Sequence, residues 1–277
     1  MIYRFGEAAR GRLAALVPAA LILAFAAPAL GQRAGPLPAT VDATYRINFT
    51  ALGDIGHFHF VSSINGEAYN LSADARVNTA IFEYDAGMGS RGTLAAGKTK
   101  PAGHNFSYRQ KTLLKKKKKG TLNMVFDGAA VTKVSFVPPY SPSTKAIPVT
   151  QDQLKSVLDP LSGVMTLSLV KASDPCVQKL PIYDGKQRFD IVFAPLGRAG
   201  ADHICSVRMV PISGHKPGEG GASVIKGTIE LVMRPVPKGN VVIPYKITVP
   251  TTVGTATLTT ERIDITMPDQ QRIALRR

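Results

Sequence analysis

Apolar and polar residues alternate with a period of two in several segments of the first half of the chain. In Tyr45-Arg-Ile-Asn-Phe every second side chain is apolar, and residues 57–61 and 68–72 repeat the pattern. A period of two places the apolar side chains on one face of a β-strand. We therefore predict strands over residues 41–137, with one face of their sheet buried and the other polar.

Glycines divide these runs at intervals typical of β-hairpins. Asn65-Gly66 and Asp127-Gly128 match the sequence preference of type I′ turns, in which both central residues have positive φ. The segments between the turns are therefore predicted to form an antiparallel meander.

The alternation ends at Val137-Pro-Pro-Tyr-Ser-Pro, because proline lacks the N–H that a strand ladder needs. Farther on, Thr150 and Gln153 have the spacing of a helix capping box. Apolar residues then follow at helical spacing, but Pro160 interrupts them. We expect helices over about 150–170: a short helix, a turn near Asp159 and a second helix.

Strand-like segments return in the second half of the chain, at residues 188–193, 203–210, 225–233, 242–249 and 254–267. The last is rich in Thr and β-branched residues, as expected of a final strand. Strands over 41–137, helices, and strands over 180–267 predict a mainly β protein: a single curved antiparallel sheet (a half-barrel) wrapped around one or two short helices. Two separate β domains are the alternative, which the short connection between residues 137 and 150 disfavours.

The N-terminus has the pattern of a secretory signal peptide. Three arginines precede an apolar run from Leu13 to Ala27, and small residues follow it. We predict a signal peptide over 1–31, cleaved near Gly31 or alternatively after Ala29, then a linker over 32–40 and one β-rich domain over 41–277. A retained membrane anchor is the alternative, but the run is shorter than the roughly 20 residues that span a bilayer. The expected location is the periplasm.

The chain has two cysteines, Cys176 and Cys205. In an oxidising, exported compartment a pair of cysteines favours a disulfide bond. The alternative is a catalytic cysteine, for which His203 is the nearest partner in the sequence.

Positive charge is concentrated in one region. The formal net charge is +15, and residues 86–126 contain ten Lys and Arg residues but no acid. Lys115, Lys116, Lys117, Lys118 and Lys119 are consecutive, and Lys111 lies just before them. We expect this run at or near a turn that ends in Gly120, either as a solvated hairpin tip or as a site that binds an anionic surface.

Motifs in the middle of the chain resemble those of a known family. They are Asp159-Pro-Leu-Ser162, Cys176, Pro181-Ile-Tyr-Asp-Gly-Lys-Gln-Arg-Phe-Asp190 and Cys205-Ser-Val-Arg-Met-Val-Pro-Ile-Ser-Gly214. They are similar to those of the exported bacterial family known as domain of unknown function 3108, in its alphaproteobacterial form. The resemblance covers nearly all of the predicted mature chain.

The resemblance implies a periplasmic half-barrel, similar in outline to the lipoprotein-carrier proteins that hold acyl chains between a curled sheet and helices. It implies no catalytic residues. The motif residues are expected to be structural: Asp159, Pro160, Ser162, Asp184, Gly185, Arg188 and Asp190. Asp184-Gly185 suits a tight turn with Tyr183 and Phe189 buried on either side, and Arg188 is expected to pair with Asp190 across the hairpin.

Other site chemistry finds little support in the sequence. His57 and His59 lie on one strand face, but no third metal ligand is near, so solvated histidines are the favoured interpretation. There is no G-x-S-x-G motif, and helix capping is the simplest role for Ser162. The lysines lack interleaved aromatic residues, which argues against nucleic acid. No metal or cofactor is predicted.

We therefore expect a non-enzymatic periplasmic protein that binds a hydrophobic or amphipathic, lipid-like ligand between sheet and helices. Its lysine run would contact an anionic membrane surface or lipopolysaccharide. A structural or protein-interaction module of the cell envelope, with an unknown protein partner, is the alternative. A hydrolase is the third and least favoured possibility.

Overall fold

The computed structural model describes residues 36–95, 97–113, 115–169, 174–217 and 224–276. The predicted signal peptide and the first part of the predicted linker lie outside this range. Among the described residues, no helix combines the length and apolar character needed to cross a membrane.

Seven strands form the first half of the sheet, in an unbroken meander. They are β1 (Thr40–Phe49), β2 (Gly53–Asn65), β3 (Ala68–Asn78), β4 (Phe82–Ala95), β5 (Lys98–Thr112), β6 (Lys115–Asp127) and β7 (Ala130–Val137). The predicted alternation is confirmed, because buried and exposed residues alternate along β3 and β6. The buried positions of β6, for example, are Gly120, Leu122, Met124 and Phe126.

Seven more strands form the second half, and all but β8 and β14 match the predicted segments. They are β8 (Gln178–Tyr183), β9 (Arg188–Ala199), β10 (Asp202–Ser213), β11 (Ile229–Pro235), β12 (Val242–Thr251), β13 (Gly254–Thr266) and β14 (Arg272–Arg276). The segment 254–267 was wrongly predicted to be the final strand. β14 follows it and pairs with the second half of β13, beyond the part that pairs with β12.

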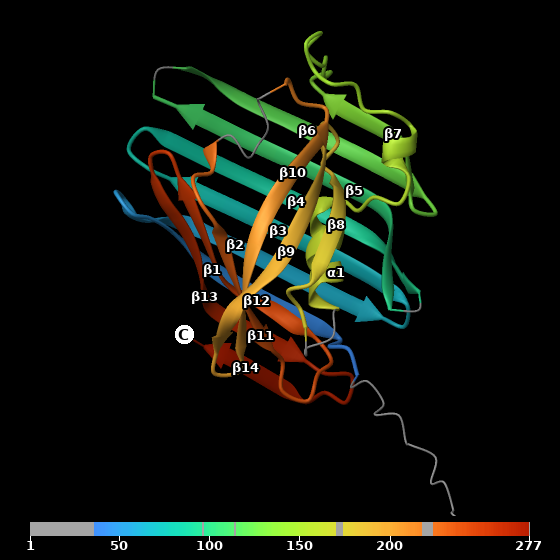
Figure 1. Ribbon diagram of the computed structural model, residues 1–277, viewed down its shortest axis with the longest axis vertical. Helices are drawn as coiled ribbons and strands as arrows, with labels where there is room; N and C mark the ends of the chain where they lie inside the picture. The colour runs from blue at the N-terminus through green and yellow to red at the C-terminus, as the bar shows by residue number, and fades with distance from the viewer. Residues whose placement is uncertain (1–35, 96, 114, 170–173, 218–223, 277) are drawn as a thin grey trace, which may run out of the picture. The chain divides into compact units, whose positions relative to one another are not determined.

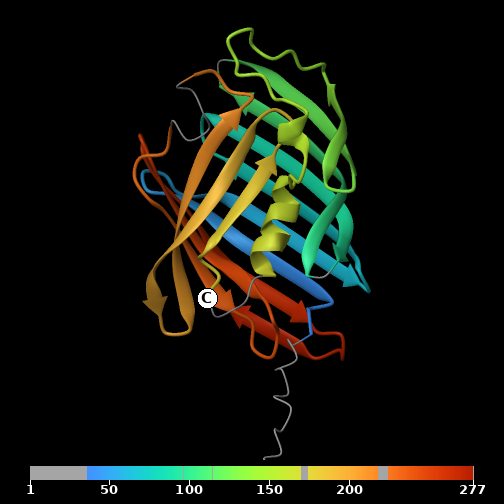
Figure 2. The same ribbon diagram turned by 45° about the vertical axis from the view of Figure 1, so that its right-hand side comes forward.

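All fourteen strands belong to one antiparallel sheet that does not close (Figure 1). β1 joins its two halves, because it pairs with β2 on one side and β13 on the other. Strands β7 and β8 end the main path of the sheet. The sheet curves so that β8, β9 and β10 lie across from the meander, with the helix between them (Figures 1 and 2). The predicted mainly β half-barrel around a short helix is confirmed.

The described part of the chain contains one α-helix, α1 (Pro160–Ser168), and one 3-10 helix, η1 (Asp152–Leu154). The expected turn before the second helix is confirmed, since Asp159 caps α1 and Pro160 is its first residue. The expected first helix is only this 3-10 turn. Thr150 and Gln153 still exchange the two hydrogen bonds of a capping box around it.

The predicted hairpins are confirmed, but their turns lie one residue later than expected. Asn65 and Asp127 are the last residues of their strands, paired with Ala68 and Ala130. The two-residue loops are therefore 66–67 and 128–129, and only their glycines have positive φ, at 59° and 62°. The type I′ prediction was wrong because strand pairing, and not the Asn-Gly or Asp-Gly pair alone, sets the register.

Helix α1 is buried on two sides because its apolar residues face both walls of the curved sheet. Leu161 and Met165 pack with Tyr69 and Leu71 of β3. On its other side, Leu167 packs in the core formed by β8–β12. Burial against both walls explains how a nine-residue helix, too short to be stable alone, is held in place.

Candidate functional site

Two apolar cavities flank helix α1. The first has a volume of about 100 Å³ and lies between α1 and the concave faces of β1, β2 and β12, where Tyr45, Phe58 and Ile243 line it. The second, of about 300 Å³, lies between α1 and β8–β11, with Phe189, Phe193 and Leu231 in its wall.

The two cavities adjoin, because Val164, Pro244 and Ile247 line both of them. Their walls are almost entirely apolar. Ligand pockets in proteins usually occupy about 300–1,000 Å³ and bury most of the ligand against apolar side chains. The larger cavity is therefore at the lower end of that range.

A third pocket of about 430 Å³ begins at the N-terminal end of α1, where Pro160 lines both it and the second cavity. Its floor is the concave face of β4–β6 and includes His104 and Phe106. The β8–β9 turn and the segment after β7 contribute Lys186 and Tyr140. The ammonium group of Lys186 lies 4.8 Å from the ring centroid of Tyr140, a cation–π contact. This pocket therefore has aromatic walls and one flexible cation.

A buried polar network centred on Asp159 adjoins this pocket, because His104 belongs to both. Its carboxylate accepts hydrogen bonds from the backbone N–H groups of Leu161 and Ser162, both at 3.0 Å. The hydroxyls of Ser90 and Ser162 also donate to it, each at 2.5 Å. His104 Nδ1 lies 3.2 Å from the same carboxylate, with both side chains almost completely buried.

The network holds Asp159 in its ionised form. Burial alone would raise the pKa of this carboxyl, but the hydrogen bond and charge of His104 and the two serine hydroxyls outweigh it, so the pKa lies below 3.8. Tyr69 completes the network through a 2.8 Å hydrogen bond with Ser162, and burial raises the pKa of its phenol. The expected capping role of Ser162 was wrong in detail: Asp159 is the cap, and Ser162 donates to it.

The arrangement does not have the geometry of a Ser-His-Asp triad. In a triad the carboxylate and the nucleophilic serine contact opposite nitrogens of the histidine ring. Here Ser90 Oγ lies 2.8 Å from Nδ1 of His104, the nitrogen that also faces Asp159. The hydroxyls of both serines already donate to Asp159. Sequence reasoning missed Ser90 and His104, although both are polar residues at inward-facing strand positions, which is the signal that could have found them.

The Asp184-Gly185 motif forms the expected tight turn between β8 and β9. Asp184 Oδ1 accepts from the backbone N–H groups of Lys186 and Gln187, at 2.8 and 2.7 Å. Gly185 has a φ of +92°, and a Cβ there would lie 2.7 Å from Leu122 of β6. The turn therefore needs glycine both for its backbone conformation and for its contact with the opposite wall of the sheet.

The neighbouring motif residues Arg188 and Asp190 form an ion pair at 2.7 Å, with both side chains largely buried. They lie on the same strand, two residues apart, so the expected pairing across the hairpin was wrong. The ion-pair partner of Asp190 on the neighbouring strand is Lys179 of β8, at 2.9 Å. Burial opposes ionisation of Asp190, but these two cations outweigh it and lower the pKa of its carboxyl. Of the flanking aromatic residues, Tyr183 is buried and Phe189 is half-buried.

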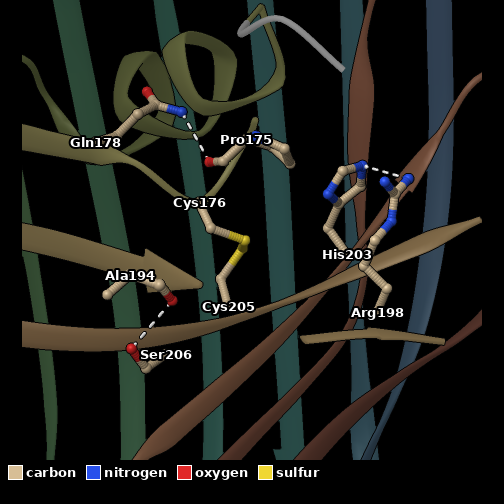
Figure 3. The surroundings of a disulfide bond; sticks show 8 residues. All are labelled: Pro175, Cys176, Gln178, Ala194, Arg198, His203, Cys205 and Ser206. Atoms are coloured by element: carbon tan, nitrogen blue, oxygen red, sulfur yellow. Dashed lines mark hydrogen bonds between the residues drawn. A yellow bond between two sulfur atoms is a disulfide. The ribbon is translucent and has the colours of Figure 1, made fainter. Parts of the chain in front are cut away.

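Cys176 and Cys205 form the predicted disulfide bond (Figure 3). It ties the segment before β8 to β10, and both residues are buried in the core behind the second cavity. His203, the alternative partner of Cys205, instead lies 3.4 Å from the guanidinium of Arg198 (Figure 3). The disulfide leaves no thiol for the catalytic alternative.

The lysine run lies in a strand, not at the hairpin tip. Lys115–Lys119 are the first residues of β6 and pair with the end of β5, while Gly120 lies within the strand opposite Tyr108. The expected position at a turn ending in Gly120 was therefore wrong, because the turn comes before the lysines. All five lysines are exposed, and none forms an ion pair with a described residue. Lys111, in contrast, donates to Glu83 of β4 at 2.7 Å.

The two histidines considered as metal ligands lie on the convex face. His59 is placed between two carboxylates, with Nε2 3.1 Å from Asp42 and Nδ1 3.2 Å from Asp74. Across the described ranges, no group of three or more His, Cys, Asp or Glu side chains has an arrangement that could hold a metal ion.

Fold and cavities together define a class of protein: an unclosed β half-barrel that holds a short helix between apolar pockets. The chain belongs to the family "Protein of unknown function (DUF3108)", whose model matches residues 44–261. Among solved structures, it is similar to the crystal structure of a β-barrel-like protein of domain of unknown function DUF1849 from Brucella abortus. That similarity has a TM-score of 0.46 and 14% sequence identity, and covers 84% of this chain and 99% of the other. No curated protein matches the chain.

Proposed function

We propose that this protein is a non-enzymatic periplasmic protein that holds a hydrophobic or amphipathic, lipid-like ligand. The observation that carries the proposal is the pair of adjoining apolar cavities on the two sides of α1. A protein that used this fold only as a scaffold would be expected to fill such spaces with side chains, because protein interiors are close-packed.

The proposed location rests on the signal-peptide pattern of residues 1–31 and on the disulfide. Disulfides persist in oxidising compartments such as the periplasm. The exposed lysines of β6 are proposed to contact anionic lipid or lipopolysaccharide, at about 1 kcal/mol per lysine near such a surface.

The third pocket is proposed to hold the polar head of the ligand. It meets the second cavity at Pro160, so a chain in that cavity could continue toward Lys186. Lys186 forms no ion pair with a described residue, which leaves its charge available to an anionic head group. Among the described residues, Asp184 is the one carboxylate that lines the pocket, and two backbone N–H groups already donate to it. We therefore favour an amphipathic ligand with a carboxylate or phosphate head.

The first test is native mass spectrometry, with lipid extraction, of mature protein purified from a bacterial periplasm. A retained ligand with an acyl chain is the expected result. Protein that carries no lipid and also fails to bind added amphiphiles would overturn the proposal.

Calorimetric titration with decanoate and with decanol then separates the head group from the tail. A hydrogen-bonded ion pair with Lys186 should make decanoate bind about tenfold more tightly than decanol. Lys186→Met should remove that difference and leave decanol binding unchanged. Val164→Phe, which fills the space shared by the first two cavities, should weaken both ligands.

Val125→Phe is the matched control, because Val125 is 46% exposed and lines none of the three pockets. It should bind both ligands as the natural chain does. If Val164→Phe has no more effect than this control, the cavities are not the binding site.

The structural or protein-interaction module remains the second candidate. The outer edge of β7 supports it, since β7 ends the strand order and an unpaired edge can accept a strand from a partner. If native mass spectrometry shows no bound lipid and the protein co-purifies with another envelope protein, this function is favoured over ligand binding.

A further inference from the structure

Four hairpin turns at one end of the sheet each carry an exposed, large apolar side chain. In an antiparallel meander every second turn lies at the same end, and here these are the turns β1–β2, β3–β4 and β5–β6. They present Leu52, Ile81 and Leu113, which are 58%, 62% and 70% exposed. The β12–β13 turn presents Val253, 77% exposed.

The β12–β13 turn belongs to the same end because β13 pairs with β1, with Ala256 opposite Phe49. The turns follow one another along the left-hand side of Figure 1, and the view in Figure 2 agrees. Hydrogen bonds join neighbouring turns in two pairs: Leu113 N–H donates to the carbonyl of Ile81 at 3.1 Å, and Thr50 N–H donates to that of Thr255, at the start of β13, at 3.0 Å. We call the four side chains Leu52, Ile81, Leu113 and Val253 the apolar rim.

The turns at the opposite end of the sheet have a different character. Their described residues include Gly66-Glu67, Gly97 and Gly128-Ala129, and the β13–β14 turn is Met267-Pro-Asp-Gln-Gln. None of the exposed large apolar side chains in the described residues lies in these turns. The turns compared at the two ends are all short, so turn length alone does not explain why one set is apolar.

The apolar rim lies next to the lysine run. Lys115 follows the β5–β6 turn directly, and all of Lys115–Lys119 are exposed. Protein interfaces are depleted in lysine. Apolar side chains bordered by lysines are instead typical of segments that lie in the head-group region of an anionic bilayer.

We infer that the apolar rim inserts into the surface of an anionic lipid membrane, while Lys115–Lys119 contact the lipid head groups. This places the end of the sheet that carries the β1–β2, β3–β4, β5–β6 and β12–β13 turns against the membrane. The inference extends the lysine part of the proposed function. It does not depend on a ligand in the cavities, because vesicle binding is measured on the protein alone.

The first experiment uses the absence of tryptophan from the chain. Leu113→Trp and Ile81→Trp each introduce a single fluorophore at the rim. Vesicles of phosphatidylglycerol should shift its emission to shorter wavelength, whereas vesicles of phosphatidylcholine should not. Leu196→Trp is the matched control: Leu196 is 53% exposed but lies near the end of β9, away from the rim. An emission that stays unchanged at both rim positions would overturn the inference.

The second experiment measures co-sedimentation with the same vesicles. The combined variant Leu52→Ser, Ile81→Ser, Leu113→Ser and Val253→Ser should bind phosphatidylglycerol at least about tenfold more weakly than the natural chain, since each buried apolar side chain contributes to partition. Val177→Ser with Leu196→Ser, which removes exposed apolar residues elsewhere, should bind normally. Both variants should keep the thermal unfolding midpoint, because the replaced side chains are exposed.

Added salt separates the contribution of the lysine run to vesicle binding from that of the apolar rim. Added salt should weaken the binding of the natural chain, because lysine attraction to lipid is screened. Replacing Lys115–Lys119 by Gln should reduce that salt dependence. When the same replacement is made in the Leu113→Trp variant, the protein that still binds vesicles should show an unchanged emission shift. If the rim-Ser and control variants sediment equally, the lysines act alone and the inserted rim is refuted, whatever the result of the decanoate titration.

Discussion

Replacing Asp159 by Asn perturbs the centre of the buried network while keeping nearly the same shape. The carboxylate accepts two backbone N–H groups of α1 and the hydroxyls of Ser90 and Ser162. Asparagine retains one acceptor oxygen, but its amide N–H₂ replaces the second oxygen and cannot accept from a hydroxyl. The variant also leaves His104 without the charge that faces it.

The expected loss in the free energy of unfolding follows from those contacts. Hydrogen bonds to a charged group contribute about 1.5–3 kcal/mol and neutral ones about 0.5–1.5 kcal/mol. All four bonds lose their charged acceptor and one hydroxyl bond is lost outright, which predicts a loss of at least about 3 kcal/mol in the free energy of unfolding. For a domain of this size that is about 6–12 °C in Tm. Asp159→Ala, which removes the helix cap as well, should lose about 4–5 kcal/mol.

Urea denaturation of the disulfide-intact protein at neutral pH is the assay. Asp152→Asn is the control, because Asp152 pairs with Lys155 at 2.7 Å but is 87% exposed. That variant should change the free energy of unfolding by less than about 0.5 kcal/mol, as expected of an exposed pair.

The pH dependence provides a second readout. The folded pKa of Asp159 is lowered, so its ionised form stabilises the protein above the unfolded pKa of about 3.8, and this stabilisation is lost as the pH falls through the folded pKa. The free energy of unfolding of the natural chain should therefore exceed that of Asp159→Asn by a constant amount near neutral pH. Below about pH 3.8 this difference should become smaller. A loss below 1 kcal/mol at neutral pH, or a difference that does not change with acid, would refute the reasoning.

Two further predictions concern the core. Cys176→Ser with Cys205→Ser should lower the free energy of unfolding by about 3.5 kcal/mol, because the disulfide joins residues 29 apart; denaturation with and without reductant measures it, and equal midpoints for the two oxidation states of the natural chain would contradict it. Gly92→Ala should cost about 1–3 kcal/mol, since its Cβ would lie 2.1 Å from the Lys100 carbonyl oxygen. Gly103→Ala, whose Cβ meets nothing closer than 3.6 Å, is the matched control in the same melts, and an equal loss would refute the clash.

Much of the fold could be predicted because its signals are local. The period of two in β1–β6 comes from strand geometry, and the Asp159-Pro160 pair begins α1 through contacts within four residues. Strand β14 was missed because Arg272–Arg276 is short and gains its place only from the free half of β13. The two turn errors have the same origin, since the register of a hairpin depends on its whole length.

The candidate site was predicted only in part. The start of the helix and the disulfide had recognisable motifs, and the sequence placed both, whereas it assigned the cap to Ser162 instead of Asp159. The cavities had none: Tyr45 and Ile243 are 198 residues apart in the sequence and line the same space. Likewise, nothing local brings Ser90 and His104 to Asp159, because β4, β5 and α1 meet only when the sheet curves around the helix.

The sequence by itself therefore determined most of the strands, the helix start, the bonded cysteines and the charge of β6, because these depend on side-chain periodicity, neighbouring residues and composition. The tertiary structure alone decided which polar residues meet at the N-terminal end of α1, how much space remains beside the helix, and which turns share an end of the sheet. Those properties arise from strand register and curvature accumulated over many pairings, which no short stretch of sequence specifies.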